Sequence, residues 1–394
     1  MHSYFYKKNI STSINFILMK KKIAIIGAGI AGLTLANLIK KNSDFEFMIY
    51  EKEESLSLDD GYGIQLAPNS ISILNKIDFQ RINSNDIFHP KALDFFSIKN
   101  EKICDLEISK FNFESSKYTT LKRSTLIEFL KDEIYTQHLR FGKNIKEVTE
   151  LKGKVLIKFR DNTNDLVDYV VGADGIFSNT KTFFEKKKTQ PLFNKAIAVR
   201  SIVKNHNLDI NEKNISLFMG SNLHLVVYPI NKKNELNLVC IIRDKKYDPE
   251  NVRSLIEKKL LTQNPNLKSL FGHDLKSWPL YSTSKINPSS NNKVFYIGDA
   301  FNGFLPTLAQ GGGQSIESAY ELFNLIKDEN LNASNIYFKN RFARVKAIRR
   351  RSKFNFFIFH FSNPLIQKIR NFFLKFLIKK RYFINSYLKP VYKN

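Results

Sequence analysis

The chain has 394 residues, of which 43% are hydrophobic, so it is long enough for two domains and a large core. Lys and Arg outnumber Asp and Glu by 62 to 37, which gives a formal net charge of +25. Its two cysteines, Cys104 and Cys240, are too few for a disulfide framework and show no metal-type spacing. No stretch approaches the roughly 20 apolar residues of a membrane-spanning helix. A cytoplasmic protein without a metal site is therefore expected.

The first 18 residues do not continue the pattern of the rest of the chain. The apolar run from Ile14 to Leu18 is too short for the core of a signal peptide. Met19 begins a basic stretch directly before the first strand-like run. We therefore expect translation to begin at Met19, or residues 1–18 to form a disordered N-terminal extension.

A strand, a glycine-rich loop and a helix are predicted next. Residues 22–26 are a short apolar run typical of a strand, and residues 30–39 have helical periodicity. In the G-x-G-x-x-G between them, Gly27 permits the tight turn, Gly29 lets a pyrophosphate approach the backbone, and Gly32 lets the helix pack closely on the strand. The N–H groups at the helix N-terminus face the same anion. This pattern predicts a dinucleotide site.

The next strand-like run, residues 45–50, ends at Glu51. This carboxylate lies about as far downstream as an acid that binds the ribose of a dinucleotide should. The alternative is an ordinary βαβ unit with a glycine turn, which the combination of strand, helix and acid makes the weaker interpretation.

A second glycine segment follows two further predicted strands. Residues 154–159 and 166–171 are strand-like and are separated by turn-forming residues 161–164. They lead into Gly172-Ala173-Asp174-Gly175. From about residue 182 to residue 287, short strands at 196–203, 215–219, 225–230 and 236–242 predict an inserted, mainly antiparallel sheet that forms the wall of a substrate pocket.

The third segment begins at Gly298-Asp299-Ala300, passes Pro306 and ends in a glycine triplet at 311–313. A helical pattern over residues 314–326 follows the triplet. One glycine loop is weak evidence, but three in this order describe a chain that returns repeatedly to one dinucleotide.

Taken together, these segments resemble the FAD-dependent aromatic hydroxylases, which are single-component flavoprotein monooxygenases with the p-hydroxybenzoate hydroxylase fold. The resemblance runs from about Lys22 to about Pro364. It implies an α/β fold, with a Rossmann-like FAD-binding domain, an inserted mainly antiparallel β-sheet substrate domain and C-terminal helices. The expected boundaries are 1–18 for the N-terminal extension, 19–181 and 288–340 for the two parts of the FAD-binding domain, 182–287 for the substrate domain, and 341–394 for a basic C-terminal helical segment.

The resemblance also implies which residues contact FAD. These are Gly27, Gly29, Ala31, Gly32, Glu51, Lys52, Arg123, Asp174, Gly175, Asp299, Gly311, Gly312 and Gly313. Residues 61–69 are similar to a segment that runs past the flavin, and the strings at 224–229 and 308–311 are most similar to the salicylate-hydroxylase branch. The chain departs from the family at Asn302, where a histidine is usual, and at Lys181, where an arginine is usual.

By resemblance, NADH or NADPH would reduce the FAD, and a flavin hydroperoxide formed with O2 would transfer one oxygen atom to a small phenolic substrate. Pro306 is expected near the flavin ring. A phenol reacts faster when deprotonated, and His224 is the best candidate for the base, although a lone histidine on a strand is more often structural.

The C-terminal segment 341–394 carries 15 Lys or Arg, no Asp or Glu, and 13 Phe or Tyr. After Pro364, six apolar residues fall on one helical face: Leu365, Ile369, Phe372, Phe373, Phe376 and Leu377. Leu374 and Ile378 blur the division between the faces. A basic amphipathic helix of this kind favours peripheral contact with the inner face of a membrane, and packing onto the protein core is the equal alternative. Nucleic-acid binding is the least favoured, since no nucleic-acid module accompanies the charge.

Alternatives to a hydroxylase of soluble phenols remain open. The basic tail favours a ubiquinone-precursor hydroxylase at the membrane surface. A second class is a flavin-dependent reductase that does not use O2. A third is a binding protein that retains a vestigial flavin fold.

Overall fold

The computed structural model describes residues 20–42, 45–56, 58, 62–186, 190–204, 208–272, 275–289, 291–328 and 332–392. The expected N-terminal extension, residues 1–18, lies outside the described residues.

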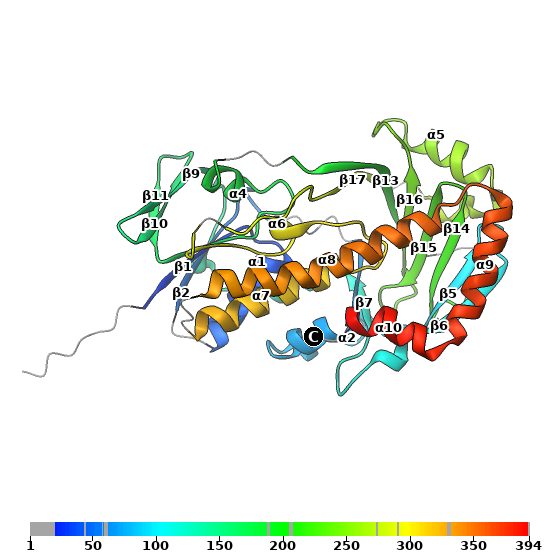
Figure 1. The fold of residues 1–394 in the computed structure, drawn as a ribbon, viewed down its shortest axis with the longest axis horizontal. Helices are drawn as coiled ribbons and strands as arrows, with labels where there is room; N and C mark the ends of the chain where they lie inside the picture. The colour runs from blue at the N-terminus through cyan, green and yellow to red at the C-terminus, as the bar shows by residue number, and fades with distance from the viewer. Residues whose placement is uncertain are drawn as a thin grey trace, which may run out of the picture.

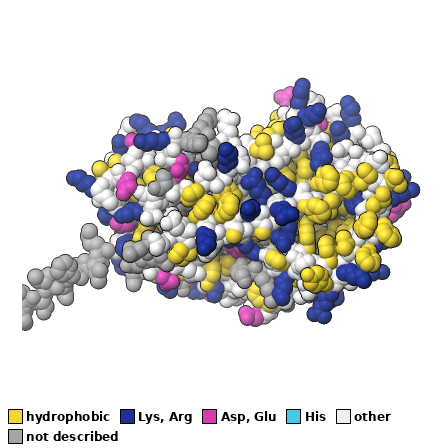
Figure 2. Space-filling view, viewed as in Figure 1, with side chains coloured by type: hydrophobic (Ala, Val, Ile, Leu, Met, Phe, Trp, Pro, Cys, Tyr) yellow, Lys and Arg dark blue, Asp and Glu magenta, His cyan; other side chains and the backbone are white. Residues whose placement is uncertain are grey.

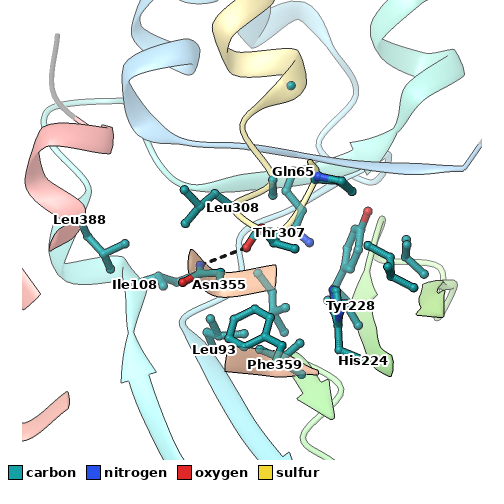
Figure 3. A pocket seen from close by; sticks show the side chains of 18 of the residues that line it. Gln65, Leu93, Ile108, His224, Tyr228, Thr307, Leu308, Asn355, Phe359 and Leu388 are labelled. Atoms are coloured by element: carbon teal, nitrogen blue, oxygen red, sulfur yellow. Dashed lines mark hydrogen bonds between the residues drawn. The ribbon is translucent and has the colours of Figure 1, made fainter. Parts of the chain in front are cut away.

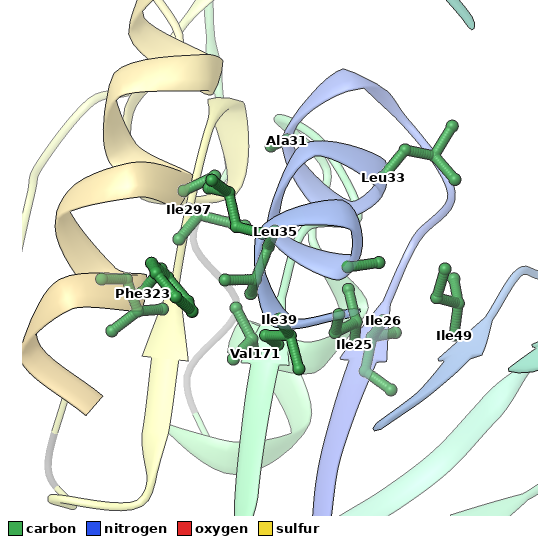
Figure 4. Close-up of a cluster of buried hydrophobic side chains, with 14 of the residues drawn as sticks. Ile25, Ile26, Ala31, Leu33, Leu35, Ile39, Ile49, Val171, Ile297 and Phe323 are labelled. Carbon is green, nitrogen blue, oxygen red and sulfur yellow. The ribbon is translucent and has the colours of Figure 1, made fainter. Parts of the chain in front are cut away.

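A five-stranded parallel sheet organises the half of the molecule that holds the first glycine loop. Its order is β18 (Val294–Tyr296), β12 (Tyr169–Gly172), β1 (Lys22–Ile26), β2 (Glu46–Tyr50) and β8 (Leu139–Arg140). Helices α1 (Ile30–Asn42) and α7 (Gly311–Lys327) pack side by side against it, and the buried side chains of Leu35, Ile39 and Phe323 meet those of the strands (Figure 4). The strand and helix predicted on either side of the first glycine loop are confirmed.

The strand predicted over residues 166–171 is wrong in detail, because the chain forms two strands there. β11 (Asn164–Val167) joins an antiparallel sheet with β9 (Ile145–Leu151) and β10 (Lys154–Phe159), whereas β12 joins the parallel sheet. Asp168 separates them, and its carboxylate accepts the N–H of Lys22 at 2.8 Å. This hydrogen bond fixes the point at which the chain changes sheets.

The second large sheet has seven strands and is mainly antiparallel. Its order is β17 (Lys276–Ser282), β13 (Leu192–Val203), β16 (Leu236–Arg243), β15 (Leu223–Pro229), β14 (Ile215–Gly220), β5 (Ala92–Ser97) and β6 (Lys102–Glu107). β14 and β5 pair in parallel. The last two strands come from within residues 19–181, the segment that sequence patterns assign to the FAD-binding domain. The inserted sheet is therefore built from two separate parts of the chain.

A small sheet joins the two halves. It contains β3 (Gly63–Leu66), β7 (Thr119–Lys122) and β4 (Ile87–Phe88). The Thr120 hydroxyl donates to the Pro229 carbonyl at 2.5 Å, and the Gly63 N–H donates to Asn237 Oδ1 at 2.6 Å. Both acceptors lie in or at the end of strands of the seven-stranded sheet, so these buried bonds fix it against the FAD-binding half.

Three C-terminal helices complete the fold. Figure 1 shows α8 (Ala333–Phe359) running from the parallel sheet to the seven-stranded sheet, α9 (Pro364–Lys379) beside β5 and β6, and α10 (Arg381–Tyr392) returning toward α2. Asn363 Oδ1 accepts the N–H groups of Leu365 and Ile366, which caps α9 at its start. The shorter helices are α2 (Pro68–Asn75), α3 (Arg123–Asp132), α4 (Asn179–Phe184), α5 (Val252–Ile256) and α6 (Asp299–Asn302). Short 3-10 or π-helical segments lie at Phe79–Arg81, Ile108–Phe111, Thr136–His138, Glu257–Leu261 and Pro265–Leu270. Among the described residues, no helix is both long and apolar enough to cross a membrane.

Candidate functional site

The three glycines of the first loop have different environments. A Cβ atom on Gly27, whose φ is +110°, would lie 2.6 Å from the Ala173 carbonyl oxygen, and one on Gly32 would lie 2.1 Å from the Gly27 oxygen. Both positions therefore require glycine for the fold itself. A Cβ atom on Gly29 would meet no described atom within 4 Å. Gly29 lines the cavity described below, so its open side leaves room for a pyrophosphate.

Glu51 lies beside this loop. One carboxylate oxygen accepts the Ala28 N–H at 2.8 Å, and the other accepts the Glu53 N–H at 3.1 Å. A carboxylate has about four acceptor sites, so these bonds fix its orientation and leave capacity for ribose hydroxyls. Lys52 is exposed and pairs with Glu53 at 3.1 Å, outside the cavity. Ala31, by contrast, lines the cavity.

The second glycine segment divides into a structural residue and a cavity residue. The Asp174 carboxylate accepts from the Ser178 hydroxyl at 2.6 Å and from the N–H and hydroxyl of Thr180, each at 2.9 Å. Burial raises the pKa of Asp174, and these hydrogen bonds oppose that shift. Asp174 thus holds the start of α4 and does not line the cavity, whereas Gly175, with φ +78° and open space beside it, does.

The third segment presents one carboxylate and a glycine turn to the cavity. The Asp299 side chain is exposed to the cavity, and the protein atoms around it raise its pKa to about 6 by desolvation. Gly311 has open space on its side-chain face, while Gly312 and Gly313 lie tightly against Ile64 and Ser70. The glycine triplet, predicted as a loop, is instead the first turn of α7. The Asp299 carboxylate and this open helix N-terminus suit the hydroxyls and ring edge of a flavin better than they suit a metal.

Helix α8 holds the loop between these groups. The Thr307 hydroxyl donates to the Ser352 carbonyl at 2.6 Å, and the Asn355 amide donates to the Thr307 carbonyl at 3.3 Å (Figure 3). Pro306, Thr307 and Leu308 line the cavity as a result. Helix α8 therefore positions the loop where Pro306 is expected to meet the flavin ring.

One cavity of about 960 Å³ joins the three glycine segments to the seven-stranded sheet. Alternation along β15 explains the sheet wall: Leu225 and Val227 pack in the cluster beneath α5, while His224, Val226 and Tyr228 face the cavity. The remaining apolar wall comes from β5, β6, β14 and β16 and from helices α8–α10. It includes Leu93, Phe95, Leu106, Leu217, Val239, Ile241, Ile358, Phe359, Leu374 and Leu388.

Several polar groups interrupt this apolar wall. Tyr228 is buried and points toward Gln65 (Figure 3), and burial raises its pKa to about 12. Arg200 lies over the Trp278 ring at 5.7 Å, and its buried Nε has no hydrogen-bond partner among the described residues. Arg123, at the start of α3, also lines the cavity.

His224 belongs to a buried pair. Its Nδ1 lies 2.6 Å from Nε2 of His360, so one ring donates to the other. Burial lowers the pKa of His224 to about 3 and lowers that of His360 as well. An imidazole with so low a pKa is poorly matched to general-base catalysis at neutral pH. The geometry keeps His224 in the cavity wall, but the pKa favours a hydrogen-bonding role over proton abstraction.

The two departures from the family pattern lie away from the cavity. Lys181 is buried over the Tyr296 ring at 5.5 Å, and burial lowers its pKa. Asn302 is buried, and neither its Oδ1 nor its Nδ2 has a partner among the described residues. Neither side chain lines the cavity.

Sequence patterns do not single out Arg200 or the part played by α8–α10 in the cavity wall, whereas Gln65 lies in the segment 61–69 expected beside the flavin. Arg200 stands within an apolar strand, and a charged residue in such a run is the signal that marks it.

Comparison with known proteins places most of the chain in one family. The model of the FAD binding domain family matches residues 20–332. The chain is 26% identical over 371 residues to 3-amino-4-hydroxybenzoate 2-monooxygenase of Streptomyces platensis, covering 89% of this chain and 92% of the relative. It is 22% identical over 350 residues to salicylate hydroxylase of Pseudomonas putida, covering 80% of this chain and 79% of the relative.

Solved structures support the same fold. HpxO of Klebsiella pneumoniae, complexed with FAD and uric acid, superposes with a TM-score of 0.82 at 17% identity, covering 94% of this chain and 96% of that one. A salicylate hydroxylase substrate complex superposes with a TM-score of 0.77 at 17% identity, covering 95% of each chain. The predicted α/β fold with an inserted, mainly antiparallel sheet and C-terminal helices is confirmed.

Proposed function

We propose, because the chain belongs to the FAD-dependent monooxygenase family, that it hydroxylates a small phenolic compound with NADH or NADPH as electron donor and O2 as oxygen source. The observation that carries this proposal is the single cavity that joins the glycine segments to the apolar sheet wall. A cofactor held at one end would face a substrate held at the other.

The residues that suit FAD divide by the part of the cofactor they would contact. Gly29 and the start of α1 suit the pyrophosphate, Glu51 suits the adenosine ribose, and Asp299 suits the ribityl hydroxyls. When bound, reduced FAD supplies the activation of O2 for oxygen transfer.

The protein contributes orientation and the exclusion of water. The apolar side chains of β5, β14, β15 and β16 would pack against an aromatic ring. The unpaired Nε of Arg200 would donate to an anionic or acceptor group on that ring, which favours a phenolic acid. Tyr228 and His224, both neutral at neutral pH because burial shifts their pKa values away from 7, would act as hydrogen-bonding groups.

An assay of oxygen uptake with a panel of phenols tests the proposal. We expect FAD-loaded protein to consume O2 with NADH or NADPH faster when a suitable phenol is added. Consumption of NAD(P)H with no substrate-dependent O2 uptake would instead favour a flavin-dependent reductase.

The variant Arg200→Gln tests the orientation of the substrate. We expect KM to rise about tenfold or more for phenols that carry a carboxylate, because one charge-assisted hydrogen bond is lost. For phenols without a carboxylate, KM should change little. Lys258→Gln removes an exposed positive charge outside the cavity and serves as the control. An equal change with both kinds of phenol would remove Arg200 from the substrate site.

A further inference from the structure

We propose that the outer face of α9 and the end of α8 dock onto an anionic lipid bilayer. The docking surface consists of Phe357, Leu365, Ile369, Phe372, Phe373 and Phe376, whose exposed fractions range from 47% to 69%. Figure 2 shows apolar side chains gathered over this end of the molecule and surrounded by Lys and Arg.

Helix α9 has apolar residues on both sides, and this explains why an apolar face stays exposed. Leu374 and Ile378 pack against the cluster that contains Phe95 and Met219, so they form the inner side of the helix. Of the sixteen residues of α9, all described, only Arg370 is buried. Contiguous exposed apolar surface of this kind marks an interaction site.

The helix is held firmly in this orientation. The Arg370 guanidinium donates to the Ile358 carbonyl at 3.2 Å, and Asn363 caps the first turn. Downstream, the Tyr387 hydroxyl donates to Asn355 Oδ1 at 2.6 Å, which fixes α10 to α8. The docking surface is therefore part of the folded protein and not a loose tail.

Charge identifies the partner as an anionic surface with an apolar interior. Residues 341–394 contain 15 Lys or Arg and no Asp or Glu. Lys368, Lys375 and Lys379 are exposed beside the aromatic face, and Lys380 lies over the Phe376 ring at 4.8 Å. Each cation near an anionic membrane contributes about 1 kcal/mol, and the aromatic side chains bury in the interface. A second copy of the chain is disfavoured, because two such basic surfaces would repel each other.

The docking surface is also the outer edge of the cavity wall. Ile369 and Phe373 line the cavity and are 47% and 55% exposed. The apolar wall therefore continues from the cavity to the surface that would meet the bilayer. If the proposed function holds, this opening would admit a lipophilic aromatic substrate directly from the membrane.

Vesicle flotation of the full-length protein tests the docking. The protein is mixed with phosphatidylcholine vesicles, with or without phosphatidylglycerol, at low and high salt. We expect flotation only with the anionic vesicles, and less of it at high salt. The variant Leu365→Ser/Phe372→Ser/Phe376→Ser removes exposed side chains that do not line the cavity. It should lower partitioning by more than about tenfold, because binding scales with buried apolar area.

The matched control is Tyr135→Ser/Leu151→Ser/Leu166→Ser, which removes side chains of 62%, 44% and 45% exposure from other surfaces. It should float like the unaltered protein. Failure of the unaltered protein to float, or equal flotation of both triple variants, would overturn the proposal. The proposal would also be overturned if the unaltered protein were dimeric in light scattering and the Leu365→Ser/Phe372→Ser/Phe376→Ser variant monomeric, since a second copy would then cover the surface.

These readouts do not depend on the reaction. Oxygen uptake with a water-soluble phenol should be the same in the Leu365→Ser/Phe372→Ser/Phe376→Ser variant as in the unaltered protein. Flotation without hydroxylase activity would therefore refute the proposed function alone, and activity without flotation would refute the docking alone.

Discussion

The Gly29→Val variant tests the cofactor site most selectively, because this position is open in the protein. No described atom lies within 4 Å of a Cβ atom there, so a side chain can leave the backbone at this position toward open space. It would instead fill the space beside the helix N-terminus where a pyrophosphate would bind. We therefore expect a folded protein that has lost its affinity for FAD.

The size of the loss follows from the contacts that would be prevented. A hydrogen bond to a charged group contributes about 1.5–3 kcal/mol. Losing two backbone donors to the pyrophosphate would cost at least about 3 kcal/mol, which is more than about 100-fold in Kd. Titration of the apoprotein with FAD, followed by flavin fluorescence, measures this change, and thermal unfolding of the apoprotein measures the fold.

Gly272→Val is the matched control. Gly272 also has no described atom within 4 Å of its Cβ position, but it does not line the cavity. We expect this variant to keep its Tm and its FAD affinity. Normal FAD affinity in Gly29→Val would refute the pyrophosphate site, and a large fall in the Tm of its apoprotein would refute the argument from open space.

Three further predictions concern ionisable groups. In the apoprotein, desolvation raises the pKa of Asp299 from 3.8 to about 6. The folded state therefore gains stability from the neutral carboxyl below about pH 4 and loses this contribution as the pH rises through about 6. Asp299→Asn should abolish this pH dependence of the free energy of unfolding, measured in urea, and Asp299→Ala should weaken FAD retention. Arg341→Met removes one of two arginine partners of the buried Glu317, which lies 3.2 Å from Arg341 with both side chains at most 4% exposed. Because Arg344 still pairs with Glu317 at 2.9 Å, the free energy of unfolding should fall by about 1.5–3 kcal/mol, the contribution of a hydrogen bond to a charged group, and the double variant Arg341→Met/Glu317→Gln should lose less than the sum of the two single losses. His224→Gln should lower kcat yet leave the pH profile of kcat/KM unchanged between pH 5 and 8, because the pKa of about 3 lies below that range; loss of an inflection near neutral pH would restore His224 as the base.

The cofactor-binding half could be predicted from sequence because its signals are local. Strand β1, the glycine loop and helix α1 lie within about 20 consecutive residues. A backbone turn with no room for a Cβ atom requires glycine, and that glycine is visible in the sequence.

The cavity wall could not be predicted in the same way because its contacts are between distant segments. The pairing of β5 with β14 joins residues more than 100 positions apart, and nothing in residues 92–97 alone selects that partner. Similarly, the sequence allows two interpretations of Asp174, which stands before a short helix: its carboxylate could contact the cofactor or cap the helix. In the structure it accepts hydrogen bonds from Ser178 and Thr180, which favours the capping role.

The C-terminal helix shows how a correct periodicity leaves its meaning open. The periodicity predicts the apolar face of α9, but the side that packs on the protein is formed by Leu374 and Ile378, two residues that blur the predicted division between the faces. The sequence does not show which face of α9 packs on the protein and which stays exposed, because that depends on where the neighbouring strand β6 lies.

The most direct test of the proposed hydroxylation is the fate of isotopically labelled O2. FAD-loaded protein, NADH or NADPH and a phenolic acid are incubated with labelled O2, and the product is analysed by mass spectrometry. We expect a hydroxylated product that carries one labelled oxygen atom. A product without the label, or consumption of NAD(P)H with the phenol unchanged, would contradict the proposal that this cavity hydroxylates an aromatic ring.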